Sequence, residues 1–342
     1  MRRLAALAVL LVACSTGGGA GPADTTGGGE HAAPLAFTVV QFNTGTSGSI
    51  ATGEGGYTSD LAKLSDEWYG DGLAWTPAVS AARAFLAATK PDVVTFQEVF
   101  HPGDCEGIPA DARKGFYCET YAPGGPTVAQ AVLGEGYQVA CNLGKPDKCA
   151  GIRKAFGTFR GCATGVCMEG LWGSTVDGCG KGARIGRAVV DLAAGGSFTL
   201  VNVHASSGFL PDDQQCRVRQ FDQIFTDLGD GAPAANGERN LVMGDFNTDP
   251  GRLAGTDPSA DRLLASVGDG RRFRFVTEAG PDATPTYGGL ANIDHVVSDA
   301  FEGDCVHPGA TPGTAPVLAT PYFDHGPAVC TLHAAGPTGG NP

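Results

Sequence analysis

The sequence predicts an α/β domain in which two sheets pack against each other and helices flank them. Short runs rich in Val, Ile, Phe and Thr recur along the chain, and segments with helical spacing lie between them. Glycine accounts for 53 of the 342 residues and charged residues for only 17%, a composition typical of a loop-rich domain rather than a helical bundle. We therefore expect one large α/β domain.

The predicted strands are short and bounded by Gly, Asp or Pro. Their β-branched and aromatic side chains suit a pleated, half-buried surface. We expect strands at 37–42, 92–96, 187–192, 198–203, 240–243, 293–297 and 328–332.

Three segments between these strands have helical features. Thr76-Pro77 opens a helix over residues 78–89, because Thr can cap the first turn and Pro fits the first helical position, and Lys90-Pro91 ends it. A second helix, with apolar residues on one face, is expected from residue 212 or 213 to residue 228, and a third over residues 257–267.

The N-terminus has the features of an export signal. Arg2 and Arg3 precede an apolar segment, Leu4–Ala13, that is too short to span a bilayer. The segment leads into Leu-Val-Ala-Cys ending at Cys14, which resembles the bacterial lipobox, in which the cysteine is lipidated. An ordinary signal peptide with an incidental cysteine is the alternative.

We therefore expect a lipoprotein signal peptide at 1–13, a flexible tether at 14–34 that begins at the lipid-attachment residue Cys14, and a folded domain at 35–335. The tether consists of Gly, Thr, Ala and Pro without periodicity, and such a segment cannot bury a core. The protein is then expected to be exported, either as a membrane-anchored lipoprotein of the cell envelope or as a secreted protein. No later run reaches the length of a transmembrane helix.

The cysteine count agrees with export. Of 11 cysteines, those other than Cys14 are even in number, which indicates up to five disulfides in an oxidising compartment. The alternative is a zinc site among Cys162, Cys167 and Cys179, although no Cys-x-x-Cys pair is present. Residues 100–185 are expected to be irregular and disulfide-rich, and the pairing is left open.

The formal net charge of -13 argues against a basic protein that coats DNA. It allows an enzyme that meets a polyanionic substrate through a bound cation, because hard cations require acidic clusters. Solubility alone accounts for the charge equally well.

Residues capable of chemistry lie at the ends of the predicted strands, where loops usually build sites. A single strand-terminal Asp or Asn more often caps a turn. Here the arrangement recurs at six strand ends, and inward-facing carboxylates would repel one another unless a cation or a substrate held them. The residues are Asn43, Glu98, His204, Asp245, Asn247, Asp294, His295, Asp324 and His325.

This mixture of side chains favours a hard cation and a phosphate ester. Oxygen ligands without a cysteine or paired-histidine motif suit Mg²⁺, Mn²⁺ or Ca²⁺. Nearby histidines can neutralise a phosphate or protonate a leaving group. Hydrolysis of a phosphate ester needs these parts together with a base for the attacking water.

Six segments carry these residues: VQFN (40–43), PDVVTFQEV (91–99), NVH (202–204), GDFN (244–247), NIDHV (292–296) and DHGP (324–327). In this order they are similar to the motifs of the endonuclease/exonuclease/phosphatase superfamily, which includes DNase I, neutral sphingomyelinases and inositol polyphosphate 5-phosphatases. The similarity covers residues 36–333 and implies a DNase I-like fold, a four-layer sandwich of two mostly antiparallel sheets flanked by helices. It also implies a Mg-dependent phosphoesterase.

The resemblance implies roles for the acidic and amide residues. Glu98 would be the principal ligand of a divalent cation, helped by Asn43 and Asp324, with Mg²⁺ expected and Mn²⁺ or Ca²⁺ as alternatives. Asp245 would orient or deprotonate the attacking water, or hold a second metal ion. Asn247 would bind the scissile phosphate.

The imidazoles would act on the phosphate. His325 would contact it and stabilise the transition state, with Asp294 fixing the His325 tautomer, and His204 would contact the phosphate or assist the leaving group. His295 is expected to be structural, because alternation along its strand points it away from the site. Arg187 either reaches the site or forms a salt bridge.

Three functions remain open, because residues 44–49 and 100–185 depart from the family pattern and such insertions hold substrate selection. The first is an extracellular phosphodiesterase or nuclease, which fits export and the complete site. The second is a phospholipid-directed enzyme, similar to sphingomyelinases or phosphoinositide phosphatases, held at a membrane by the lipid anchor. There Phe209-Leu210 would touch the membrane or pack beneath its own loop, and Trp68-Tyr69 and Trp172 have the same two roles open. The third is a non-catalytic surface binding protein, which the complete site disfavours. The expected partner is a nucleic acid or a phospholipid head group, and we expect a monomer.

Overall fold

The computed structural model describes residues 35–46 and 53–335. The expected signal peptide, Cys14 and the tether lie outside the described residues. Contacts divide the chain into Met1–Pro34 and Leu35–Pro342, and the second unit contains every described helix and strand. Within the described ranges, no helix has the length and apolar character that crossing a bilayer requires.

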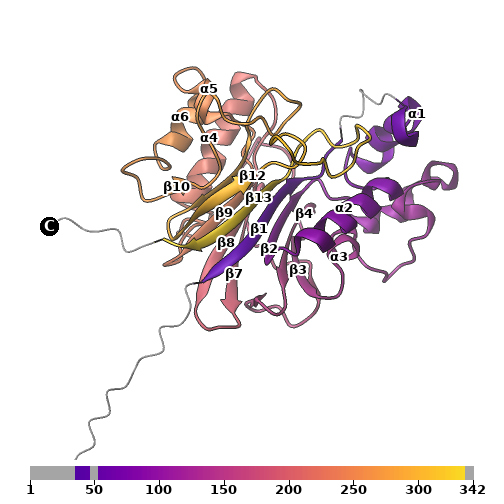
Figure 1. The fold of residues 1–342 in the computed structure, drawn as a ribbon, viewed down its shortest axis with the longest axis horizontal. Coiled ribbons are helices and arrows are strands. Elements are labelled where there is room, and N and C mark those ends of the chain that lie inside the picture. The colour runs from indigo at the N-terminus through magenta and orange to yellow at the C-terminus, as the bar shows by residue number, and fades with distance from the viewer. Residues whose placement is uncertain (1–34, 47–52, 336–342) are drawn as a thin grey trace, which may run out of the picture. The chain divides into compact units, whose positions relative to one another are not determined.

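Two sheets form the centre of the Leu35–Pro342 unit (Figure 1). The strands of the seven-stranded sheet are β1 (Ala36–Asn43), β2 (Val93–Gln97), β3 (Tyr137–Asn142), β4 (Lys145–Arg153), β6 (Val166–Cys167), β12 (Phe301–Val306) and β13 (Ala328–Ala334). Those of the six-stranded sheet are β5 (Gly157–Phe159), β7 (Ile185–Leu192), β8 (Ser197–His204), β9 (Asn240–Asp245), β10 (Arg274–Phe275) and β11 (Asp294–Ser298).

Both sheets are mixed and mostly antiparallel. The strand orders are β12-β13-β1-β2-β4-β3-β6 and β10-β11-β9-β8-β7-β5. The pairs β1–β2, β3–β6 and β8–β9 are parallel, and the other neighbours are antiparallel. The parallel pairs β1–β2 and β8–β9 lie near the middle of their sheets, where strands from distant parts of the sequence end side by side.

Helices cover the outer face of each sheet. They are α1 (Ser59–Leu64), α2 (Thr76–Thr89), α3 (Val128–Leu133), α4 (Pro211–Phe225), α5 (Pro250–Leu253) and α6 (Pro258–Leu264). Figure 1 shows α2 and α3 beside the seven-stranded sheet, and α4, α5 and α6 beside the six-stranded sheet. Shorter helical turns lie at Glu54–Gly56, Ser65–Tyr69, Pro102–Gly107, Ala110–Arg113 and Tyr117–Glu119.

Three apolar clusters separate four layers. Val39 lies in the cluster between the sheets, whereas its neighbour Val40 lies in the cluster under α2 and α3. On the second sheet, Leu241 faces the first sheet and its neighbour Val242 packs in the cluster under α4 and α6. Because successive side chains of a strand point to opposite faces, each central strand contributes to two clusters. The predicted four-layer sandwich is confirmed.

Some element boundaries differ from the prediction. Thr76 is the first residue of α2 rather than its cap, and the N-cap is Trp75, whose side chain makes no capping hydrogen bond. Lys90 ends α2 in the left-handed conformation, next to the proline that predicted this end. The helix expected to end at residue 228 is α4, which begins at Pro211 and ends earlier, at Phe225.

The prediction that residues 100–185 are irregular throughout is wrong. They contain α3 and the strands β3, β4, β5 and β6. Cys141 and Cys149 behave as apolar residues and are buried under α2 and α3, so a pattern that counts them as loop cysteines misses the strands. Lys145-Pro146 at the start of β4 also breaks the apolar run that a strand prediction requires.

Each cysteine other than Cys14 forms a disulfide, so the alternative of a zinc site is wrong. Cys141–Cys149 and Cys305–Cys330 join directly paired residues of neighbouring antiparallel strands. Cys179–Cys216 joins the segment before β7 to α4. The remaining pairs are Cys105–Cys118 and Cys162–Cys167.

Candidate active site

Polar side chains gather at one end of the two packed sheets. Asn43 ends β1, and Glu98 directly follows β2, which runs parallel to β1. His204 ends β8 and lies in register with Asp245 at the end of the parallel strand β9. Asp294 begins the antiparallel strand β11 opposite Asp245. These residues meet because parallel strands end together and an antiparallel neighbour begins where they end.

Asn43 connects the residues of both sheets. Its Nδ2 lies 3.3 Å from Glu98 Oε1, 3.0 Å from Asp245 Oδ2 and 3.3 Å from His325 Nε2. Its Oδ1 accepts the backbone N–H of Gly45 at 3.0 Å, which fixes the amide orientation. The Asn43 side chain is fully buried. Three of the predicted site residues are therefore held around one amide.

His325 is held by Asp294 and faces Asp245. Its Nδ1 lies 2.7 Å from Asp294 Oδ2, and its Nε2 lies 4.0 Å from Asp245 Oδ2. Burial lowers the pKa of His325, but the charge and hydrogen bond of Asp294 and the charge of Asp245 outweigh burial and raise it to about 10. Burial would raise the pKa of Asp294, and the positive His325 lowers it instead. The pair is thus an imidazolium and a carboxylate at neutral pH.

Asp245 is a carboxylate held by amide donors. Its Oδ1 accepts the backbone N–H of Asn247 at 2.7 Å, and its Oδ2 accepts Asn247 Nδ2 at 2.8 Å. Asn247 Nδ2 also lies 3.0 Å from the carbonyl oxygen of Ala205. Burial raises the pKa of Asp245, and the Asp294 charge raises it further, against the opposing effect of His325. A raised pKa makes this carboxylate a stronger base than an ordinary aspartate.

The partly exposed Glu98 pairs with the buried His204, and Glu98 Oε1 lies 3.3 Å from His204 Nε2. Burial lowers the pKa of His204 below 6.5, so this imidazole is neutral at pH 7. Burial raises the pKa of Glu98, but His204, His325 and Asn43 together lower it to about 2. A neutral His204 contributes no charge to that effect. We therefore attribute the ionised state of Glu98 to hydrogen bonds from His204 and Asn43 and to the charge of His325.

The backbone is strained at two residues of the site. Glu98 has a φ of 56° and Asn247 a φ of 51°, in the left-handed region that costs a non-glycine residue about 1 kcal/mol or more. Gly244 of β9 has a φ of 151°, and a Cβ there would lie 2.0 Å from the carbonyl oxygen of Val203 on the neighbouring strand β8. The close approach of the two strands that carry His204 and Asp245 therefore requires glycine at position 244.

A series of hydrogen-bonded, buried amide side chains holds the Asp294 carboxylate in place. Gln41 Nε2 donates to Asp294 Oδ1 at 2.9 Å and to Gln97 Oε1 at 2.8 Å. Gln97 Nε2 in turn donates to Asn202 Oδ1 at 2.8 Å, and Asn202 donates to the backbone of β2 and β4. All three amides are fully buried. Gln41 and Asn202 lie two residues before Asn43 and His204 on the same strands, and Gln97 directly precedes Glu98. Sequence reasoning missed them because amides inside a strand resemble ordinary polar positions.

The oxygen atoms around Glu98 are suitable ligands for a hard divalent cation. The hydrogen bonds of Glu98 are made by Oε1, and its Oε2 lies so close to Gly45 that a Cβ there would approach it to 2.4 Å. Asp324 Oδ1 is buried without a hydrogen-bond partner among the residues that the structure describes, and lies 3.9 Å from His325 Nε2. Burial raises the pKa of Asp324 to about 6, and the Glu98 charge adds to this against the effect of His325. A cation would supply the partner that Asp324 Oδ1 lacks and would relieve the repulsion from Glu98.

A second set of possible ligands, two aspartates and a histidine, fits a cation less well. Ligand atoms of Asp245, Asp294 and His325 lie within 4.8 Å of one another. Both oxygens of Asp294, however, already accept hydrogen bonds, one from Gln41 and one from His325 Nδ1. The oxygens of Glu98 and Asp324 are therefore the better cation ligands, and Asn43 can join them only through Oδ1, which accepts the Gly45 N–H and keeps a second lone pair.

Asp71 is a half-buried acid next to this group that sequence reasoning missed. Burial and the charges of Asp66, Glu98 and Asp324 raise the pKa of Asp71 to about 6. Its Oδ1 is buried without a hydrogen-bond partner within the described part of the chain, and its φ of 56° is left-handed. The only signal in the sequence is an aspartate between two glycines at a distance from any predicted strand end.

His295 points away from the site, as predicted from alternation along β11. Its ring lies between those of Phe246 and Phe275, at centroid distances of 5.6 Å and 5.2 Å. Its Nδ1 lies 3.2 Å from Thr277 Oγ1. Burial lowers the pKa of His295 to about 4, so it is a neutral core residue.

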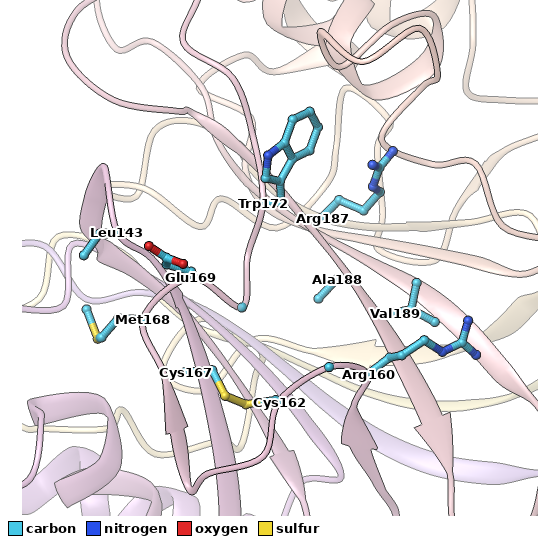
Figure 2. A pocket seen from close by; sticks show the side chains of 12 residues that line it. Leu143, Arg160, Cys162, Cys167, Met168, Glu169, Trp172, Arg187, Ala188 and Val189 are labelled. Carbon is cyan, nitrogen blue, oxygen red and sulfur yellow. A yellow bond between two sulfur atoms is a disulfide. The ribbon is translucent and has the colours of Figure 1, made fainter.

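Arg187 does not reach the site, and the salt-bridge alternative holds. Its guanidinium lies 2.6 Å from Asp230 Oδ2 and 5.2 Å from the centre of the Trp172 ring. The side chains of Arg187 and Trp172 line a cavity of about 750 Å³, and none of the residues predicted to form the active site lines it. Figure 2 shows Trp172 beside Arg187 on one side of this cavity and the Cys162–Cys167 disulfide on the other. The other arginine that lines this cavity, Arg160, also forms a salt bridge, with Asp191.

The segments that the sequence left open between membrane contact and packing differ in their exposure. Phe209 and Leu210 are 84% and 70% exposed, so the alternative in which they pack beneath their own loop is wrong. Tyr69 is buried and stacks on Phe116 at a centroid distance of 4.3 Å.

The sequence and the fold were compared with those of known proteins. The sequence model of the Endonuclease/Exonuclease/phosphatase family matches residues 40–313. No curated protein matches the sequence significantly. The fold is similar to that of a functionally unknown conserved protein from Enterococcus faecalis V583, with a TM-score of 0.51, 12% identity, and coverage of 87% of this chain and 100% of that chain.

Two further solved structures are similar. An endonuclease/exonuclease/phosphatase from Beutenbergia cavernae DSM 12333 has a TM-score of 0.50 and 16% identity, covering 88% of this chain and 72% of that chain. ANGEL2, a 2',3'-cyclic phosphatase, has a TM-score of 0.50 and 11% identity, covering 88% of this chain and 95% of that chain. At these identities the likeness concerns the fold.

Proposed function

This chain belongs to the endonuclease/exonuclease/phosphatase family, and from that premise we propose that it hydrolyses phosphate esters in a reaction that depends on a divalent cation. The observation that supports this most strongly is the placement of Asn43, whose amide contacts Glu98, Asp245 and His325 at once. A cation ligand, a base and an imidazolium thereby surround one point, which is what attack of water on a phosphate requires.

The side chains divide the reaction between them. The protonated His325 neutralises charge on the phosphate oxygens, and Asp294 keeps the proton on Nδ1 so that Nε2–H faces the substrate. In its ionised form Asp245 accepts the proton of the attacking water, because Asn247 holds its carboxylate in place and a pKa raised to about 8 makes that form a stronger base than an ordinary aspartate. The water oxygen forms a bond to phosphorus and the bond from phosphorus to the alcohol oxygen breaks. The leaving alkoxide takes a proton from solvent, and Asp245 returns to solvent the proton that it accepted.

The cation would be held by Glu98, Asn43 and Asp324. When bound, it supplies Lewis acidity toward the phosphoryl oxygens. Mg²⁺ is the ion we propose, because every ligand of this set is an oxygen, with Mn²⁺ or Ca²⁺ as alternatives. His204, neutral and hydrogen-bonded to Glu98, keeps that carboxylate ionised for the cation and lies where it can also contact the phosphate or the leaving group.

The test uses bis-p-nitrophenyl phosphate as substrate. EDTA is expected to abolish hydrolysis and added Mg²⁺ to restore it, and Glu98→Ala is expected to lower kcat/KM by roughly a hundredfold or more. The matched control is Glu169→Ala, an exposed glutamate in the cavity of Figure 2, which leaves the rate unchanged. Wild-type rates for Glu98→Ala at limiting metal would overturn the assignment of the cation ligands. Inactivity of the wild type toward all phosphate esters would instead favour a non-catalytic binding protein.

We further propose that the enzyme works outside the cytoplasm, anchored through a lipid on Cys14 and as a monomer. The support is the N-terminal signal sequence and the disulfide pairing of the remaining cysteines. Replacement of Cys14 by serine is expected to release the protein from membranes or to block its maturation. Unchanged membrane retention would contradict the anchor.

A further inference from the structure

A pocket of about 550 Å³ opens beside the candidate catalytic residues Asp324 and His325. Its walls come from residues 285–290, 308–310 and 316–327. Among the described residues that line it, Asp324 and His325 are the only charged groups, and none is a lysine or an arginine. Apart from His325 and the divalent cation proposed at Asp324, the described lining residues offer a substrate no positive charge.

The walls of this pocket are apolar. Leu290 is 79% exposed, and Val317 and Leu318 pack on the core beneath the pocket while still lining it. The ring of Tyr287 lies 4.8 Å from that of His325, which places an aromatic wall directly at the site. An isolated exposed leucine is common on protein surfaces. Leu290 differs because it lies in a pocket that has no lysine or arginine among its described lining residues and that continues into the site.

The pocket on the other side of the site has different chemistry. It has a volume of about 340 Å³, and its charged lining residues are Glu98, Asp104, Asp147, Lys145 and Lys181, of which Lys145 forms a salt bridge with Asp147. No residue lines both pockets. Asn43 contacts Glu98 of the charged pocket and His325 of the apolar pocket. A phosphate bound between Glu98 and His325 therefore has a charged environment for one substituent and a largely apolar environment for the other.

We propose that the substrate is a phosphodiester with one apolar, lipid-like substituent, which lies in the pocket beside His325, and one polar substituent on the Glu98 side. This inference rests on the proposed phosphoesterase function. A nucleic-acid strand fits less well, because every nucleotide adds a negative charge that the pocket beside His325 does not neutralise. An alkyl chain gains affinity there by up to roughly fourfold for each methylene removed from water.

The experiment compares p-nitrophenyl esters with a common leaving group. Methyl, butyl and octyl p-nitrophenyl phosphates and the p-nitrophenyl ester of thymidine 5'-phosphate are hydrolysed below micellar concentrations by the Leu35–Pro342 unit, which contains every described core cluster and disulfide. We expect kcat/KM to rise at least tenfold from the methyl to the octyl ester, mainly through KM. The nucleotide ester is expected to be no better than the methyl ester.

Two variants locate the effect. Leu290→Ser is expected to remove most of the gain of the octyl ester and to leave the methyl ester unchanged. The matched control is Leu143→Ser, a leucine 57% exposed that lines the cavity of Figure 2 instead, and it is expected to change neither rate. A series independent of chain length, preference for the nucleotide ester, or an equal effect of Leu290→Ser on both alkyl esters would each overturn the inference.

Failure of the proposed function has a different signature. If none of the esters is hydrolysed, the catalytic proposal fails, and the pocket is then tested by calorimetric titration with octylphosphonate and methylphosphonate. Tighter binding of octylphosphonate to the wild type than to Leu290→Ser supports the apolar pocket. Equal affinity of the two phosphonates, or of the two proteins for octylphosphonate, overturns it.

Discussion

Replacement of Asp294 by asparagine tests the electrostatic coupling at the centre of the site. The substitution keeps the size of the side chain and removes a negative charge whose oxygen lies 2.7 Å from His325 Nδ1. In the wild type, Asp294 is the largest cause that raises the pKa of His325 from 6.5 to about 10 against the effect of burial. The difference between these values corresponds to roughly 5 kcal/mol in favour of the protonated imidazole. Without Asp294 we expect the pKa of His325 to fall toward its ordinary value.

The titration is measured by NMR of the ring protons in EDTA, with the His325 signal assigned by its absence in His325→Gln. In the wild type the imidazole is expected to stay protonated through neutral pH, and in Asp294→Asn to lose its proton there. The activity of the variant is expected to fall by about 10²–10⁴-fold at pH 8 and by less at pH 6. An unchanged titration would show that Asp294 does not hold the proton. Equal losses at both pH values would show that the variant removes geometry rather than charge.

The same coupling predicts a pH dependence of stability. The pKa of His325 is raised in the folded state, so its contribution is complete below 6.5 and is lost as the pH rises through about 10. Asp294 has a lowered pKa, so its contribution is present above 3.8 and is lost in acid. The difference in free energy of unfolding between wild type and Asp294→Asn is therefore expected to be largest between these limits, at mildly acidic pH.

Gln41→Leu removes the donor to two buried acceptors, Gln97 Oε1 and Asp294 Oδ1. We expect it to lower the free energy of unfolding by about 1–3 kcal/mol for each acceptor, and also to reduce kcat. Stability within about 0.5 kcal/mol of the wild type in thermal unfolding would contradict the role of this amide chain. Paired replacement of Cys179 and Cys216 by alanine opens a link between residues separated by 37 positions and is expected to cost about 4 kcal/mol. Urea unfolding with and without a reducing agent measures this cost, and a paired variant as stable as the oxidised wild type would contradict it.

Three features of the structure depend on tertiary contacts and could not be predicted from local sequence patterns. The amides Gln41 and Gln97 lie inside strands, where they resemble ordinary polar positions until both sheets are packed. The acid Asp71 approaches Glu98 only through a left-handed turn between two glycines. The strands β3 and β4 were hidden because their cysteines count as loop residues in sequence and as apolar core in the structure.

The sequence by itself determined the family, the four-layer fold and the set of polar residues that reach the candidate site. The site residues could be predicted because they end apolar β-rich runs, and the ends of parallel strands meet at one edge of a sheet. The family and the four-layer fold followed from the resemblance of the six motifs. Only the tertiary structure decided the disulfide pairs, the partners of each carboxylate and the contrast between the two pockets. Those depend on distances between residues far apart in the chain, such as Asn43 and His325, and burial and charge at such distances are properties of the packed molecule alone.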